Sequence, residues 1–520
     1  MSTTNPSMML VLATLSGVST HLALFRRGEW DVQAPKIVLS YLALLIGAVV
    51  LDRAAKANYY DFGAPYPWLV KGVGCHILGI YASMLIYRAY FHRLSRFPGP
   101  FFARLSNFYV TALSARKLHL YEETAELHKI YGDYVRLGPT ELSITDPNAV
   151  KAIYGSQAKT SKGPWYTVLE PRVSLQMERD KKEHARRRKV WDQGFSSRGQ
   201  LIDVIERELG NSMDISRWFN YYSFDVMGDL SFGKSFNMLV DGKDAYILKQ
   251  LHTDMKSIGL FSHLTWLFPF VKRIPVNPPD RPDVFSSLLE AYEQGPKTKQ
   301  DTEDLHGDAY LIIVAGSDTT AATLTNIFFH LASDQVLYKR LQAELDALTD
   351  LSQDRLREIK LLDAVINETL RLHPAVPSGT QRLTPPEGMT IGERYIPGDV
   401  MLCIPSHTLF RGKHHLLPFD IPPAVKQDVS SAELTMTDER VFSRPDEFLC
   451  ERWTTKPELV KDQSAFIPFN SGPYSCVGKQ LALMELRPEG ICLFGGKKDT
   501  FTLVTAPLEL VFSKREGKRG

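Results

Sequence analysis

Several features are missing from this sequence, and each absence excludes a class of protein. The 520 residues contain five cysteines, which are scattered and form no Cys-x-x-Cys pair. This pattern argues against a disulfide framework or a zinc site and favours a reducing compartment. The net charge is only +2, so nucleic acid is not expected as a partner. A Walker loop, a Gly-x-Gly-x-x-Gly turn, a Gly-x-Ser-x-Gly elbow and internal repeats are also lacking.

Long apolar runs are present only near the N-terminus, at residues 8–25, 37–51 and 72–90. A helix needs about 20 apolar residues to span a bilayer, and about 17 are tolerated. The first and third runs qualify, whereas for the second run a buried soluble helix is a serious alternative. A cleaved signal peptide is an alternative for the first run, but no basic segment precedes it. We predict a membrane anchor at residues 1–96 with two or three transmembrane helices.

Basic residues beside these runs predict their orientation. Arg26 and Arg27 follow the first run, and Arg93 and Arg96 follow the third. The positive-inside rule places both basic loops in the cytosol and the N-terminus in the lumen. The sequence FPGP at 97–100 then forms a stiff hinge, because proline fixes φ and lacks an N–H. The domain that follows is expected to be cytosolic.

One cysteine, Cys476, lies in a Gly/Pro/Ser loop just before a helical pattern, where residues 469–478 read FNSGPYSCVG. A sulfur at a helix N-terminus faces the positive end of the helix dipole and free N–H groups, which favour thiolate. Gly472 and Gly478 let the backbone approach a large flat ligand, and Phe469 can shield the sulfur. A buried structural cysteine is the alternative for a lone Cys.

Three further patterns accompany this loop. A long helical pattern at 305–331 contains AGSDTT at 315–320, which makes one face small and hydroxylated. A packing seam would give the same composition. A basic helix at 180–195 contains His184 and Arg188, which by themselves suggest only a solvated face. A helix at 362–372 contains Glu368 and Arg371, an i,i+3 pair that is usually a surface pair.

Together these motifs resemble those of the cytochrome P-450 monooxygenases, in family order from the hinge at 97 to the C-terminus. The resemblance implies a fold that is mainly α with small β-sheets, the cytochrome P-450 fold, preceded by N-terminal transmembrane helices. It divides the chain into an anchor at 1–96 and a haem-thiolate domain at 97–520. Haem b would lie between the helix at 315–320 and the loop at 469–478.

The resemblance also implies residue roles. Cys476 would be the axial ligand of the haem iron, and Asp318 and Thr319 would deliver protons to bound dioxygen. Glu368, Arg371 and Arg452 would form a buried structural cluster. The other expected cofactor-binding residues are Phe469, Gly472, Gly478, Ala315 and Gly316, with His184, Arg188 and Arg382 at the propionates. The chain departs from the family at Tyr474, where arginine or histidine is usual and tyrosine brings no charge.

The implied reaction inserts one oxygen of O2 into an apolar small molecule, a terpenoid or other fungal secondary metabolite. No flavin or nicotinamide motif is present, so electrons from NADPH would come through a separate NADPH-cytochrome reductase on the endoplasmic reticulum membrane. The alternatives are a haem-thiolate isomerase or dehydratase, or a non-catalytic haem binder or defective gene product. Asp318 and Thr319 argue against the isomerase.

Several spacings also depart from the family pattern. Segments near 195–218, 271–280 and 487–499 are short, and 412–437 resembles an insertion. Pro488 stops a helix that would otherwise continue. Misplaced exon boundaries would produce such changes. We therefore also consider the hypothesis that the chain as written folds poorly and holds haem weakly, the alternative being a natural variant with shortened helices.

Overall fold

The structure of the chain is a computed structural model. It describes residues 6–26, 30, 33–56, 66–171, 173–191, 211–232, 236–243, 262–267, 298–348, 353–415, 435–437, 439–486, 498–499, 503–504 and 509–511. The predicted short segments near 271–280 and 487–499, and most of 195–218, lie outside the described residues. Two compact units divide the chain: residues 1–109 with 136–140 and 263–278, and the remainder.

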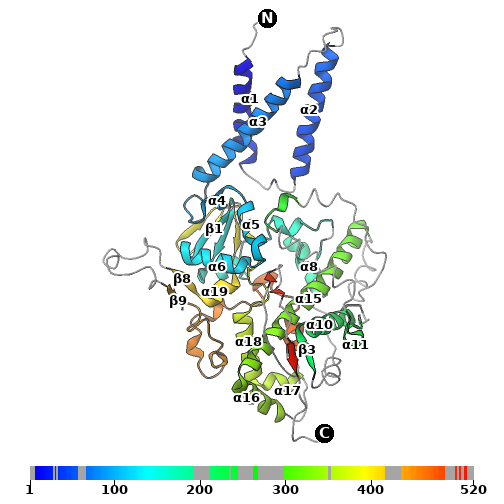
Figure 1. The fold of residues 1–520 in the computed structure, drawn as a ribbon, viewed down its shortest axis with the longest axis vertical. Coiled ribbons are helices and arrows are strands. Elements are labelled where there is room, and N and C mark those ends of the chain that lie inside the picture. The colour runs from blue at the N-terminus through cyan, green and yellow to red at the C-terminus, as the bar shows by residue number, and fades with distance from the viewer. Residues whose placement is uncertain are drawn as a thin grey trace, which may run out of the picture. The chain divides into compact units, whose positions relative to one another are not determined.

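Most described elements are helices (Figure 1). They are α1 (Pro6–Thr20), α2 (Ala34–Lys56), α3 (Tyr66–Ile86), α4 (Phe101–Leu105), α5 (Phe108–Lys117), α6 (Leu120–Tyr131), α7 (Asn148–Tyr154), α8 (Lys181–Trp191), α10 (Ile215–Phe232), α11 (Met238–Asp241), α15 (Lys299–Ser333), α16 (Gln335–Asp346), α17 (Gln353–Glu358), α18 (Lys360–Leu372), α19 (Ser406–Arg411) and α20 (Lys479–Glu485). Single π-helical turns, His21–Phe25 and Tyr87–Phe91, extend α1 and α3.

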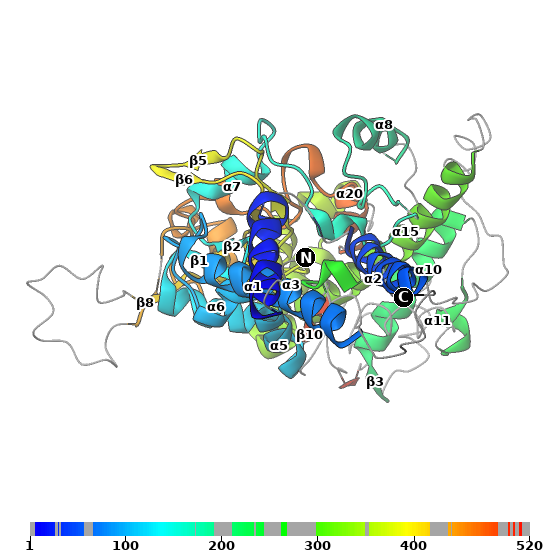
Figure 2. The ribbon, with the colours of Figure 1, turned by 90° about the horizontal axis from the view of Figure 1, so that it is seen from above.

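The strands are short. They are β1 (Tyr134–Gly138), β2 (Glu141–Ile144), β3 (Ser212–Asp214), β4 (Arg382–Leu383), β5 (Met389–Ile391), β6 (Arg394–Ile396), β7 (Met401–Cys403), β8 (Lys413–His415), β9 (Thr435–Thr437), β10 (Lys498–Asp499), β11 (Leu503–Val504) and β12 (Glu509–Val511). The largest sheet has the order β1-β2-β7-β4, in which β2 and β7 are parallel. The hairpin β5-β6 lies beside α7 (Figure 2). This arrangement confirms the predicted mainly α fold with small sheets.

Two helices of the N-terminal unit are long and apolar enough to cross a membrane. They occupy Ser7–Phe25 and Leu69–Phe91, while Ala34–Val50 of α2 is a shorter apolar helix. Helices α1 and α3 cross at two glycines, because a Cβ on Gly17 would lie 2.0 Å from the carbonyl oxygen of His76 and one on Gly79 2.1 Å from that of Thr14. Such small residues allow close backbone approach in membranes.

A histidine links all three of these helices. The His76 Nδ1 lies 2.8 Å from Ser16 Oγ of α1, and its Nε2 lies 3.0 Å from the Tyr41 hydroxyl of α2. A second polar contact joins His21 Nδ1 and Ser83 Oγ at 2.8 Å. Hydrogen bonds of this kind between apolar helices hold them in one bundle.

The core of the larger unit is built on α15. Helix α15 is also long and apolar enough to span a membrane. However, 78% of its most apolar stretch is buried within the protein, so it is a core helix. Helix α10 packs along it, with the rings of Phe219 and Phe328 4.7 Å apart edge to face. Aromatic pairs in this geometry contribute about 1 kcal/mol beyond burial. The predicted pattern at 305–331 thus lies within the longer helix α15.

The fully buried carboxylate of Glu368, on α18, accepts hydrogen bonds from four residues. Arg371 donates from Nε and Nη2 at 2.9 and 2.8 Å, and Arg452 donates from Nε at 3.1 Å. The Leu449 N–H and the Trp453 indole N–H add bonds of 2.9 and 2.8 Å. These donors satisfy the lone pairs of a charge that would otherwise be very costly to bury.

We predict that Glu368→Ala destabilises the protein by about 3–5 kcal/mol, because two buried guanidinium groups lose their counter-charge. Chemical denaturation of the purified protein measures this. Glu358→Ala is the matched control, since Glu358 pairs with Arg355 at 3.1 Å on the exposed surface. That change should cost at most about 0.5 kcal/mol. Equal effects of the two substitutions would contradict the assigned role of Glu368.

Candidate functional site

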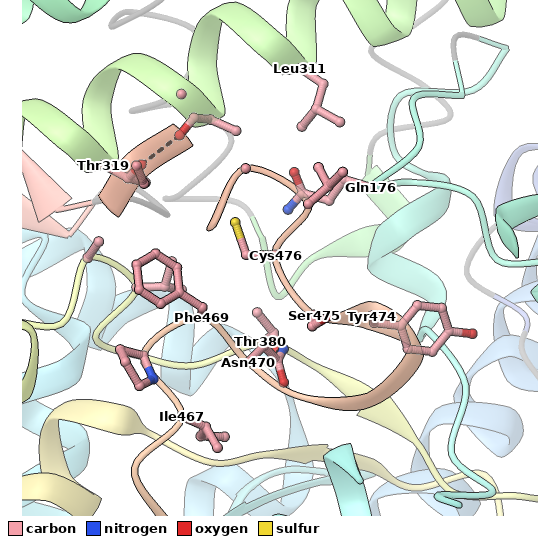
Figure 3. Close-up of a pocket in the computed structure, with 18 of the residues that line it drawn as sticks. Gln176, Leu311, Thr319, Thr380, Ile467, Phe469, Asn470, Tyr474, Ser475 and Cys476 are labelled. Carbon is pink, nitrogen blue, oxygen red and sulfur yellow. Dashed lines mark hydrogen bonds between the residues drawn. The ribbon is translucent and has the colours of Figure 1, made fainter. Parts of the chain in front are cut away.

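A cavity of about 300 Å³ lies between α15 and the loop at 467–478. Its lining is mostly apolar and contains one cysteine, Cys476, whose sulfur enters it. Figure 3 shows this sulfur pointing toward the space bounded by Thr319, Leu311 and Gln176, whereas the Tyr474 ring extends away from it. A pocket of this size and polarity is typical of a small-molecule or cofactor site.

The loop that carries Cys476 is held by its own backbone. The Cys476 N–H donates to the Phe469 carbonyl oxygen at 2.8 Å, which closes the loop over eight residues. Phe469 also lines the cavity beside the sulfur, as predicted for a shielding ring. Gly478 lines the cavity as well, and a Cβ there would lie 4.0 Å from the Cys476 sulfur.

The structure gives a different reason for Gly472 from the one the sequence suggested. Gly472 has φ +66° and does not line the cavity. A Cβ on it would lie 2.4 Å from the Tyr154 carbonyl oxygen and 2.8 Å from the backbone of Gly155. Glycine is therefore required where the loop packs against the end of α7, and not where it faces a ligand.

The electrostatics of the thiol also differ from the sequence expectation. The Cys476 side chain is accessible, but the space it faces is the cavity. Burial raises the pKa of this thiol, and the Gly478 N–H and the Arg188 and Lys479 cations only partly oppose that effect. The local field alone does not favour thiolate. Coordination by a metal deprotonates a thiol outright.

Helix α15 forms the wall opposite the loop. Ala315, Gly316, Thr319 and Thr320 all line the cavity. The Thr319 hydroxyl donates to the Ala315 carbonyl oxygen at 2.7 Å. Gly316 also packs on Met227, because a Cβ there would lie 2.4 Å from the Met227 sulfur. Asp318 is buried and does not line the cavity, whereas Thr319 does.

Basic side chains gather at another part of the lining. Arg188 donates to the Ser475 carbonyl oxygen at 2.6 Å and so ties α8 to the residue before Cys476. Arg382 of β4 is buried, and its guanidinium carbon lies 5.0 Å from the Tyr474 ring centroid. His184 contacts the same ring edge to face at 4.9 Å. Burial and the neighbouring cations lower the pKa of His184 to about 3, so the imidazole is neutral.

The basic run at 180–195 suggested a solvated helix face, and one arginine of α8 does not lie on such a face. Arg187 is buried and donates to Asp308 at 2.6 Å and to Asp304 at 3.2 Å, both on α15. Arg186 is exposed but pairs with Glu183 on its own helix. The basic run is therefore partly an internal tie between α8 and α15.

Two residues of the cavity lining, Lys162 and Glu485, belong to no recognisable sequence motif. Lys162 lines the cavity and is only 3% exposed. Glu485, at the end of α20, also lines it, and neither of its carboxylate oxygens has a hydrogen bond of ordinary geometry. Burial raises the pKa of Glu485 to about 8, although the nearby Thr320 hydroxyl opposes the shift.

These features define a mainly α protein with a cofactor-sized cavity and one inward-facing thiol. The sequence profile described as "Cytochrome P450" matches residues 98–281, 275–415 and 429–488. The chain belongs to the cytochrome P450 family. The profile leaves residues 416–428 of this chain unmatched, and these residues lie inside the predicted insertion. The matched region ends one residue after Arg487.

Fungal monooxygenases are among the relatives. A cytochrome P450 monooxygenase of Eupenicillium brefeldianum is 46% identical over 86% of this chain and 97% of its own length. Another, of Fusarium pseudograminearum, is 42% identical over 98% of both chains. Tryprostatin B 6-hydroxylase of Aspergillus fumigatus is 35% identical over 93% of this chain and 90% of its own length.

The residues present fit the haem that this family carries. Apolar and small residues cover the walls, the Cys476 sulfur supplies a metal ligand, and Lys162, Arg188 and Arg382 supply positive charge for carboxylates. The hydroxyl of Tyr474, at the same basic end, has no hydrogen-bond partner in the described structure.

We predict that Glu485→Gln changes how stability depends on pH. The folded state raises this carboxyl's pKa from 4.5 to about 8, so its contribution is fully present below pH 4.5 and is lost as pH rises through about 8. The variant should have about the same melting temperature as the wild type at pH 5 and a higher one at pH 8. The corresponding gain in the free energy of unfolding at pH 8 is at most about 4 kcal/mol. Thermal melting measures this, with the exposed Glu458→Gln as control. A pH-independent difference would contradict the prediction.

Proposed function

We propose that the protein is a haem-dependent monooxygenase that inserts one oxygen of O2 into an apolar small molecule. The observation that carries the proposal is the Cys476 sulfur, which projects into an otherwise mostly apolar cavity facing α15. The proposed substrate is a fungal secondary metabolite, of terpenoid or another class. The relatives support this, since one of them is named as the hydroxylase of tryprostatin B.

Haem b, when bound, would supply activation of O2, and the Cys476 sulfur would ligate its iron. Phe469 and Gly478 would shield the sulfur from water, and Arg188 and Arg382 would hold carboxylates of the cofactor. The Thr319 hydroxyl lies on the cavity wall, where it can hold a proton for the reacting oxygen. Asp318, the residue before Thr319 on α15, is the second proton-delivering residue that we propose.

Cys476→Ser is expected to abolish the red-shifted absorption band that the reduced protein shows with carbon monoxide, because serine does not provide a thiolate ligand. The matched control is Cys403→Ser. Cys403 lies outside the cavity and donates to the Ser378 carbonyl oxygen at 2.9 Å, which a serine hydroxyl can also do. If the band persists in Cys476→Ser, the proposed ligand is wrong.

Thr319→Ala should keep haem but release more of the NADPH-derived electrons as peroxide, because the wall loses the hydroxyl that holds the proton. The ratio of product formed to NADPH consumed measures this coupling. Thr325→Ala is the control on the same helix, since Thr325 does not line the cavity and its hydroxyl donates to the Ala321 carbonyl oxygen at 2.8 Å. Equal coupling in the wild type and Thr319→Ala would remove the proposed role of Thr319.

The electron donor that we propose is an NADPH-cytochrome reductase on the same membrane. Assays with and without NADPH and reductase distinguish the remaining candidate activities. A monooxygenase needs both, a haem-thiolate isomerase or dehydratase turns over without them, and a non-catalytic haem binder gives no product in either assay. Product analysis after co-expression with a reductase and candidate scaffolds then identifies the substrate.

We also propose that residues 1–96 anchor the protein in the endoplasmic reticulum membrane with the catalytic domain in the cytosol. The loop after α1 and the segment after α3 can both face the cytosol only if α2 also crosses the bilayer. The contact of Tyr41 with His76 supports a place for α2 in the same bundle. This proposal therefore has three spans and a lumenal N-terminus.

Alkaline carbonate should leave the full-length chain in the membrane pellet, because spanning helices are not extracted as peripheral proteins are. A chain that lacks residues 1–96 is the control and should be found mainly in the supernatant. Extraction of the full-length chain would contradict the proposed anchor.

One observation favours a second candidate, a defective gene product. The alignment with the Fusarium relative runs over 574 positions, more than the 520 residues of this chain, so part of that relative has no counterpart here. The profile match is also interrupted at the predicted insertion. Sequencing of the transcript tests this candidate, since correctly spliced messages would encode the missing segments if exon boundaries are misplaced.

A further inference from the structure

Lys162 is a buried cation that makes no ion pair in the described structure, and only the more distant Glu178 favours its charge. Its side chain is 3% exposed, and its single hydrogen bond, of 3.2 Å, goes to the Leu175 carbonyl oxygen. No carboxylate in the described part of the chain lies within ion-pair distance of it. An ammonium group has three donors and is costly to bury without a counter-charge. The site thus leaves two donors of Lys162 for a ligand.

The surroundings of Lys162 are basic as well. The cavity lining of the described structure contains Lys162, Arg188, Arg382 and the neutral His184, and its only carboxylate is Glu485 on α20. Burial and the nearby Arg382 lower the pKa of Lys162 to about 7. An anionic ligand would remove this penalty, because it favours the charged form of every cation around it.

Lys162 stands next to the residue at which the chain departs from its family. Its Nζ lies 4.8 Å from the Tyr474 ring centroid, and the Arg382 guanidinium carbon lies 5.0 Å from the same centroid. An arginine at position 474 would therefore share one small volume with two other cations. Three cations in this volume would be more than the site needs. The chain has Lys162 and Arg382 there, with the uncharged Tyr474 ring beside both of them.

We propose that Lys162 binds a propionate carboxylate of the haem and so supplies the positive charge that Tyr474 does not provide. This inference rests on the proposed haem-dependent function. The Tyr474 ring supports the ammonium through a cation–π contact, and the remaining N–H donors of Lys162 would be available to the ligand's carboxylate.

The test measures haem retention and not activity. Full-length protein loaded with haem is mixed with excess apomyoglobin, and the rate of haem transfer is followed by absorption. Lys162→Met should lose haem about ten- to a hundredfold faster than the wild type, as expected when a charged hydrogen bond to the ligand is removed. Lys162→Arg, which keeps the charge, should stay within about threefold of the wild type. Lys151→Met, an exposed lysine on α7, is the control and should not differ from the wild type.

A double substitution makes the test specific. Lys162→Met/Tyr474→Arg should recover most of the lost retention, because the arginine restores the missing charge beside Arg382. If methionine prevents folding, Lys162→Gln removes the charge with a polar side chain and replaces it in both experiments. Three results would overturn the proposal: wild-type retention in the uncharged variant, equal loss in Lys162→Arg, or no recovery with Tyr474→Arg. A wild-type chain that takes up no haem would instead contradict the proposed function.

Discussion

The buried carboxylate of Glu368 is the interaction on which the site depends. It can stay charged in the core only while Arg371, Arg452, Leu449 and Trp453 all donate to it. Those donors come from α18 and from the segment at 449–453, so one carboxylate fixes two distant parts of the chain. The arginines then donate further to carbonyl oxygens of Phe410, Ser443, Arg444, Pro445, Glu447 and Leu459. The Cys476 loop begins only a few residues later and starts from this rigid support.

The cavity lining combines two electrostatic environments. Around Tyr474 the lining is basic and unbalanced, which suits the carboxylates of a large cofactor. Around Glu485 and Thr320, burial holds a carboxyl in its neutral form at moderate pH. The sulfur of Cys476 lies in the lining that connects them. A single ligand that is anionic at its rim and metal-centred inside matches this distribution of charge.

Periodicity predicted individual helices, and the family resemblance predicted the fold class and the central residue of the site. The helices at 305–331 and 362–372 lie within α15 and α18, and the loop of Cys476 faces a cavity. Local sequence did not reveal Lys162 or Glu485, because their importance comes from burial and from side chains that are distant in the chain. It also gave the wrong environment for Arg187, since a basic run looks the same whether or not acids of another helix face it.

Other misses have the same physical origin. The reason for Gly472 is the backbone of α7, and the direction of the thiol pKa depends on desolvation, which exceeds the effect of a short helix. Asp318 and Thr319 were both predicted to deliver protons, and of the two only Thr319 lines the cavity. Residues adjacent in a helix point about 100° apart, so spacing alone could not decide which one lines the wall.

The central claim is that this chain, with its shortened segments, forms a haem site through the Cys476 thiolate. The most direct measurement is the haem-to-protein ratio of the purified wild-type chain, together with the carbon monoxide spectrum of the reduced protein. The account predicts one haem per chain and a stable, strongly red-shifted band that marks a thiolate ligand. A ratio far below one, or a band typical of a protonated or replaced ligand, would contradict it and would favour a chain that lacks sequence needed to hold its cofactor.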